Sequence, residues 1–152
     1  MATPVCEVLL TDLPLVVPAE QALVETGAVL DFWGVVRLTE EQAEIAGIEY
    51  EAHYRMAAHQ LRVLAEEAMQ MFQLQQISIR HRLGFVPVGE PSLLVRVGSR
   101  HRAAAFEASE WIVVALKQRV PIWKHPHGAA QLSGAAKIST STFPRARSLS
   151  EV

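Results

Sequence analysis

Five potentially cationic side chains flank one nearly uncharged apolar segment of the sequence. Arg100, His101 and Arg102 precede it, Lys117 stands at its end, and Lys124 follows past a proline. Backbone N–H groups at a helix N-terminus are unpaired and the helix dipole is positive there, so such a site attracts anions such as phosphate. Cations are locally unfavourable at this position. The pattern therefore predicts that His101 and Arg102 are retained to hold something negative.

Lys117 and Lys124 suggest a different chemistry. Two ammonium groups held close together depress each other's pKa, and an apolar neighbour such as Trp123 adds to the effect. A lysine tuned in this way becomes a nucleophile or general base near neutrality. The alternative is structural, because Lys117 and Arg119 would also serve as solvated charges that complement the dipole at a helix C-terminus.

The distance between the two ends of the segment indicates more than one chain. Arg102 and Lys117 are 15 residues apart, which is about 22 Å at the helical rise. One chain could bring both to a single pocket only through an awkward fold. Two copies packed antiparallel along this helix would do so readily, and we therefore expect a homodimer with shared sites.

Other candidate ligands predict no metal and no cofactor. His125 and His127 form an HxH pair, but no Cys or further His lies at ligand spacing, so zinc is not expected. The lone Cys6 cannot form an internal disulfide, fits a reducing cytoplasm, and is expected to be a half-buried strand residue. The RHR of 80–82 is expected on an exposed sheet face or on an edge protected by charge.

Composition limits the class of protein. The 152 residues suit one domain, with half of them hydrophobic. No apolar run approaches a membrane span, and no signal peptide is expected. A net charge of −2 argues against a strongly basic nucleic-acid binder. Residues 1–77 hold 3 of the 14 Lys and Arg but 12 of the 16 acids, which predicts a basic, anion-attracting face in the second half.

The pattern of apolar residues predicts an α+β two-layer sandwich with two long helices on one sheet. The expected strands are 6–15, 28–37, 48–54, 76–84 and 92–100, with an extended 122–124, and Gly34 hints at a bulge. The expected helices are 18–26, 55–74 and 102–119. Residues 38–47 are expected to be a loop or a short helix and 85–91 a turn-rich loop. The domain is expected over 1–127, with a poorly ordered tail over 128–152.

Four segments resemble the large, catalytic subunit of molybdopterin synthase. These are GVVR at 34–37, IEYEAHYRMA at 48–57, ISIRHRLGFVPVGE at 77–90 and SRHRAAAFEASEWIVVALKQRVPIWK at 99–124. The resemblance covers about residues 25–126. It implies an α/β hammerhead-like fold with a mixed or antiparallel sheet.

The resemblance also implies a cytoplasmic sulfurtransferase that needs no metal. Family members form a homodimer within a heterotetramer, in which each large subunit binds a small ubiquitin-like sulfur-carrier subunit. The Gly-Gly C-terminus of that carrier bears a thiocarboxylate and inserts into the active site. Two sulfurs pass in successive steps to cyclic pyranopterin monophosphate, and the product is molybdopterin.

Site residues carry over position by position from the resemblance. Arg37, His101 and Arg102 would hold the cyclic phosphate and pterin oxygens. Lys117 would lie nearest the thiocarboxylate and act in acid–base or covalent chemistry, and Lys124 would neutralise developing charge. The remaining matched positions are Phe32, Val35, Val36, His125 and Pro126.

Two departures leave an alternative open. The family usually has a longer loop with Asn and Gly after its arginine, whereas RLTEEQAEIAG at 37–47 is acidic where a phosphate should approach. The segment after Lys124 also fails to match. A non-catalytic relative would use the same basic pocket to bind a phosphorylated ligand or a partner's acidic tail. An RNA-binding domain is a third reading, opposed by the acidic N-terminal half.

Overall fold

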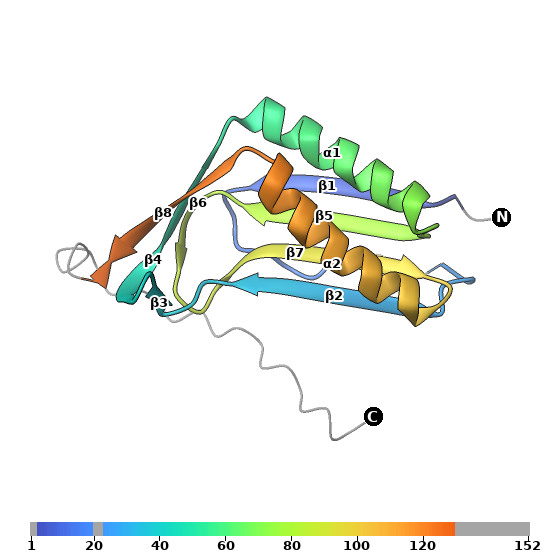
Figure 1. Ribbon diagram of the computed structural model, residues 1–152, viewed down its shortest axis with the longest axis horizontal. Helices are drawn as coiled ribbons and strands as arrows, with labels where there is room; N and C mark the ends of the chain where they lie inside the picture. Colours follow the sequence, from blue (N-terminus) through green and yellow to red (C-terminus); the bar gives the residue numbers. More distant parts are fainter. Residues whose placement is uncertain (1–2, 20–22, 130–152) are drawn as a thin grey trace, which may run out of the picture.

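The computed structural model describes residues 3–19 and 23–129, which form two sheets and two long helices (Figure 1). The first strands are β1 (Val5–Thr11), β2 (Ala28–Val35), β3 (Thr39–Glu40) and β4 (Ala43–Ala52). Helix α1 (Tyr54–Met71) leads to β5 (Gln76–Arg82), β6 (Gly84–Pro87) and β7 (Pro91–Ser99). Helix α2 (Arg102–Arg119) and β8 (Ile122–Gly128) complete the fold.

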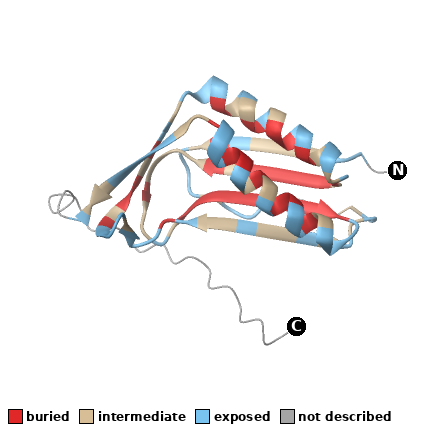
Figure 2. Cartoon of the chain, in the orientation of Figure 1, coloured by how far each residue is buried: buried red, intermediate tan, exposed pale blue. Residues whose placement is uncertain are grey.

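The larger sheet has the order β1-β5-β7-β2 and carries both helices on one face (Figure 1). Strands β1 and β5 are parallel, whereas β7 is antiparallel to both β5 and β2. The core lies between this sheet and the helices, and Figure 2 shows the central strands buried along their length. Its fully buried large side chains include Leu61, Leu64, Ile77, Ile79, Val95, Val97 and Ile112. The predicted two-layer α+β architecture is confirmed.

Both long helices lie close to their predicted bounds. In α1, the apolar spacing places Ala57, Leu61 and Leu64 in the core. The Met56 N–H donates to His53 Nδ1 (3.4 Å) and so caps the start of the helix. Helix α2 spans Arg102–Arg119 as predicted, because Pro121 prevents its continuation.

The smaller sheet is built around β4 at one end of the larger sheet (Figure 1). Strand β4 pairs antiparallel with β6 and with β8. Ile48, Tyr50 and Val86 form a second small core there. Two predictions are wrong here. Residues 85–91, predicted as a turn-rich loop, contain part of β6, and residues 38–47, predicted as a loop or a short helix, contain β3 and the start of β4.

The strands of the hairpin between β3 and β4 were not predicted because its turn has an unusual sequence. Glu41 and Gln42 occupy its turn with φ of 50° and 66°. A two-residue turn with both residues left-handed normally contains Asn-Gly or Asp-Gly, so its sequence signal is missing here. Its apolar signal is also weak, since residues 41–44 are exposed and three of them are Glu or Gln.

The predicted helix 18–26 is wrong where it can be judged. Residues 20–22 lie outside the described residues, and 23–26 contain only a turn, closed by the Thr26 N–H on the Leu23 carbonyl (2.9 Å). The preceding segment runs extended along the sheet face opposite the helices. There Arg96 donates to the Pro18 carbonyl (3.0 Å) and Arg80 to the Val16 carbonyl (3.4 Å), so side chains of the sheet bond the backbone of this segment.

The RHR motif is neither an exposed face nor an edge. It lies on β5, an interior strand between β1 and β7. Arg80 pairs with Glu7 (2.9 Å) and Arg82 with Glu90 (3.2 Å), and both arginine side chains are largely covered. Residues 130–152, which hold most of the predicted tail, lie outside the described residues.

Candidate functional site

A cavity of about 540 Å³ lies where the end of α2 meets the end of β2 and the smaller sheet. Its walls come from both sheets and one helix. The lining residues used below are Phe32, Val35, Val36, Arg37, Glu40, Tyr50, His81, Lys117 and Lys124. The cavity therefore gathers basic side chains from segments far apart in the sequence.

The cavity brings together six of the residues singled out from the sequence. Phe32, Val35 and Val36 come from the end of β2 with Arg37, and they face Lys117 of α2 and Lys124 of β8 across the same hollow. The register of β2 on β7 shifts between Gly34 and Val35, so the predicted irregularity at Gly34 is confirmed. Such a bulge re-aims the residues that follow it.

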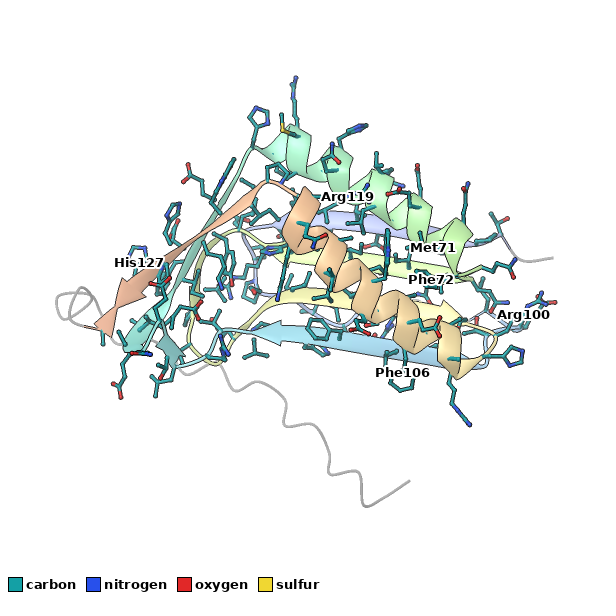
Figure 3. The ribbon with its side chains drawn as sticks, in the orientation of Figure 1. Met71, Phe72, Arg100, Phe106, Arg119 and His127 are labelled. Carbon is teal, nitrogen blue, oxygen red and sulfur yellow. The ribbon has the colours of Figure 1, made fainter. Side chains whose placement is uncertain are left out.

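The other predicted residues lie elsewhere in the single chain. His101 and Arg102 lie at the opposite end of α2, and His101 lines a separate hollow of about 530 Å³. Figure 3 shows this separation through Arg100 and Arg119 at the two helix ends. His125 and Pro126 lie on the exposed part of β8 beyond Lys124, and His125 Nε2 is 3.2 Å from Glu51 Oε2.

The polar groups of the cavity form an asymmetric arrangement. Lys124 Nζ donates to Glu40 Oε1 (3.1 Å), and Arg37 Nη2 lies 3.5 Å from Glu40 Oε2. The hydrogen bond from Lys124 is the main reason that the pKa of Glu40 is lowered. Lys117 has no hydrogen bond or ion pair within the described ranges, and it lies between Val113, Leu116 and Val120 in the wall. Its amine is thus available to a ligand.

His81 is a cavity residue that sequence reasoning did not assign to the site. Its ring stacks edge-on against Tyr50, with centroids 5.1 Å apart, and its Nδ1 lies 2.8 Å from the Arg82 carbonyl oxygen. Burial lowers the pKa of His81 to about 4, although the hydrogen bond to Arg82 opposes this shift. At neutral pH the ring is uncharged, so Nδ1–H donates to the carbonyl and Nε2 is an acceptor. The available signal was a histidine on the apolar face of an alternating strand.

Other reactive groups lie outside the cavity. Cys6 is half-buried on β1, as predicted, and burial raises the pKa of its thiol. Over residues 3–19 and 23–129, no group of three or more His, Cys, Asp or Glu side chains could hold a metal ion. No helix in the same ranges is long and apolar enough to cross a membrane.

The fold and the site define a two-layer α+β protein with a cavity at one end of α2 that is lined by Arg37, Lys117 and Lys124. The sequence matches the MoaE protein family over residues 10–119, and the chain belongs to that family. The fold agrees. The X-ray crystal structure of molybdopterin synthase from Staphylococcus aureus has a TM-score of 0.69 at 29% identity, covering 80% of this chain and 89% of that one.

The curated relatives that the sequence matches include catalytic subunits of molybdopterin synthase. The molybdopterin synthase catalytic subunit of Bos taurus is 42% identical over 98 residues, which are 64% of this chain and 52% of the relative. That of Thermoplasma volcanium is 37% identical over 100 residues, 66% of this chain and 73% of the relative. A complex of subunits 1 and 2 of molybdopterin-converting factor from Helicobacter pylori has a TM-score of 0.57 at 25% identity, covering 67% and 66% of the two chains. The chain spans about half the length of its mammalian relatives.

Proposed function

We propose that this chain is the catalytic subunit of a molybdopterin synthase. It would transfer sulfur from the thiocarboxylated C-terminus of a small ubiquitin-like carrier to cyclic pyranopterin monophosphate, giving molybdopterin. The observation that carries the proposal is the convergence of Arg37, Lys117 and Lys124 on one cavity. Family membership supports it. The lone Cys6 fits a reducing cytoplasm as the place of reaction.

The cavity suggests a role for each basic side chain. The planar guanidinium group of Arg37 suits phosphate oxygens, with which it would form charge-assisted hydrogen bonds. Lys117 lacks a competing partner among the described residues and lies against apolar neighbours, so it suits attack on, or proton transfer to, the carrier's thiocarboxylate. Lys124 would stabilise negative charge that develops as sulfur is transferred. Val35, Val36 and Phe32 would form an apolar wall, whereas His125 and Pro126 lie outside the cavity lining and have no assigned role.

We also propose that His101 and Arg102 complete the site of a second copy. They lie at the far end of α2 from Lys117, so two chains packed antiparallel along this helix would place them at each other's cavities. Exposed apolar side chains on α2 support such packing, since Phe106 is 61% exposed and Val114 47%. Figure 3 shows Phe106 projecting on the side of α2 away from α1. The assembly would be a homodimer that binds two small carrier subunits.

Reconstitution with a thiocarboxylated carrier tests the function. We expect Lys117→Ala to abolish conversion of the precursor to molybdopterin, measured by mass spectrometry, because the cavity loses its unpaired amine. The control is Arg119→Ala, at the same helix end but paired with Glu67 outside the cavity. Unchanged turnover in Lys117→Ala would refute the mechanism. A wild-type complex that forms but yields no product would indicate the non-catalytic relative.

The same assay tests the shared site. Inactive Lys117→Ala and Arg102→Ala chains are mixed and allowed to exchange subunits. Each mixed dimer would hold one intact site, so random exchange restores about a quarter of wild-type activity. A mixture that regains nothing although exchange is complete contradicts the antiparallel arrangement.

A further inference from the structure

A carboxylate already occupies the point where two of the cavity's cations meet. Glu40 Oε1 accepts a hydrogen bond from Lys124 Nζ at 3.1 Å, and Oε2 lies 3.5 Å from Arg37 Nη2. The Glu40 side chain is 18% exposed, whereas those of Arg37 and Lys124 are 80% and 50% exposed. The carboxylate is thus the inner member of the cluster, and the two cations remain open to a ligand.

The backbone at Glu40 explains how the carboxylate is presented. Strand β3 has only two residues, and Glu40 pairs with Ala43 across the turn formed by Glu41 and Gln42. Left-handed φ values cost a non-glycine residue roughly 1 kcal/mol or more each. The hairpin adopts this tight turn in spite of the strain, and the turn places Glu40 within hydrogen-bond distance of Lys124 on β8.

The ion pairs of Arg37 and Lys124 with Glu40 are weak enough for an anionic ligand to replace them. Arg37 and Lys124 are open to solvent, which screens their attraction to Glu40, and exposed ion pairs contribute only about 0.2–1 kcal/mol. A phosphate or carboxylate arriving at Arg37 and Lys124 would gain charge-assisted bonds of the same kind. It would also be repelled by the Glu40 carboxylate if that group stayed within a few ångströms. The ligand and the Glu40 carboxylate therefore compete for the position beside Arg37 and Lys124.

We propose that Glu40 is an internal competitor that sets the anion affinity of the cavity. Its carboxylate pairs with Arg37 and Lys124 in the empty protein and is displaced when an anionic group of the ligand binds. That group is a carboxylate of the carrier's tail or a phosphate of the substrate. Only the choice of these two ligands rests on the proposed function, because the competition itself follows from the geometry. A doubly charged anion displaces Glu40 more readily than a singly charged one, so Glu40 determines selectivity as well as affinity.

Direct binding measurements test the proposal. Calorimetry at fixed low ionic strength compares the wild-type chain with Glu40→Gln, using inorganic phosphate in one arm and a peptide ending in a Gly-Gly carboxylate in the other. The amide keeps the size of the side chain and removes its charge. We expect about two- to fivefold tighter binding in Glu40→Gln for the probe that occupies this place. The probe that binds more tightly to Glu40→Gln than to the wild type identifies the group that displaces the Glu40 carboxylate.

The matched control is Glu44→Gln, which removes a charge from the same hairpin but outside the cavity lining. Circular dichroism checks that each variant is folded. Equal or weaker binding in Glu40→Gln overturns the proposal, as does an equal gain in Glu44→Gln or the absence of binding to both proteins. Because these readouts need no turnover, a wild-type protein that binds as expected but makes no molybdopterin refutes the proposed function alone.

Discussion

Replacement of His81 by phenylalanine should change how the stability of the protein depends on pH. The folded ring has a pKa of about 4 because it is buried, against about 6.5 in an unfolded chain. One pKa unit corresponds to 1.36 kcal/mol, so the full effect on the free energy of unfolding is about 3 kcal/mol. Phenylalanine keeps a ring against Tyr50 and cannot titrate.

The direction of the effect follows from which state binds the proton. Below pH 6.5 the unfolded chain protonates His81, whereas the folded protein keeps the ring neutral until about pH 4. The unfolded state therefore binds more protons within this window, and stability falls as the pH falls. Between pH 7.5 and pH 5 the loss assigned to His81 is about 2 kcal/mol.

Urea denaturation at pH 7.5 and pH 5 measures the effect. The loss of unfolding free energy between the two values should be about 2 kcal/mol smaller in His81→Phe than in the wild type. His59→Gln is the control, because His59 is exposed on α1. The absolute stability of His81→Phe is expected to differ, since the bond to the Arg82 carbonyl is lost. If His81→Phe and the wild type lose the same unfolding free energy between pH 7.5 and pH 5, the assignment of a neutral, buried imidazole is refuted.

Two further predictions concern the smaller sheet. The double change Glu41→Asn and Gln42→Gly places preferred residues at the left-handed turn positions, so the midpoint of urea unfolding should rise by an amount equivalent to about 1 kcal/mol; an unchanged midpoint would argue against strain in this hairpin. Gly47→Ala should lower the thermal midpoint by an amount equivalent to about 1–3 kcal/mol, because its Cβ would overlap the Phe85 ring and the Val86 carbonyl. Gly128→Ala, with nothing within 4 Å of an added Cβ, is the control and should melt like the wild type.

The two helices were predictable because their signals are local. Ala57, Leu61 and Leu64 repeat at helical spacing, and Pro121 marks the end of α2. The hairpin at Glu41 and Gln42 was missed because its turn lacks glycine and its strands are polar. The predicted helix at 18–26 was wrong, and the carbonyls of Val16 and Pro18 instead accept hydrogen bonds from Arg80 and Arg96, which lie far along the chain.

Prediction of the site shows the same division between local and distant signals. From residue types alone, Lys117 was better explained as a charge at a helix end than as a reactive amine beside Lys124, and only the family resemblance added Arg37 to these two lysines. Glu40 had no local mark of a site, and the only mark of His81 was its place on the apolar face of an alternating strand. The place of Glu40 depends on the pairing of β4 with β3 and β8, and that of His81 on the position of β5 between β1 and β7.

The parallel pairing of β1 with β5 has a consequence for synthesis of the chain. Val5 pairs with Gln76, so the partner of the first strand is made 71 residues after it. At about 5–20 residues per second, translation leaves β1 without that partner for roughly 4–14 s. The apolar Val8 and Leu10 have no sheet to join during this interval. The nascent chain thus offers a chaperone an uncovered amino-terminal strand until the middle of the protein has left the ribosome.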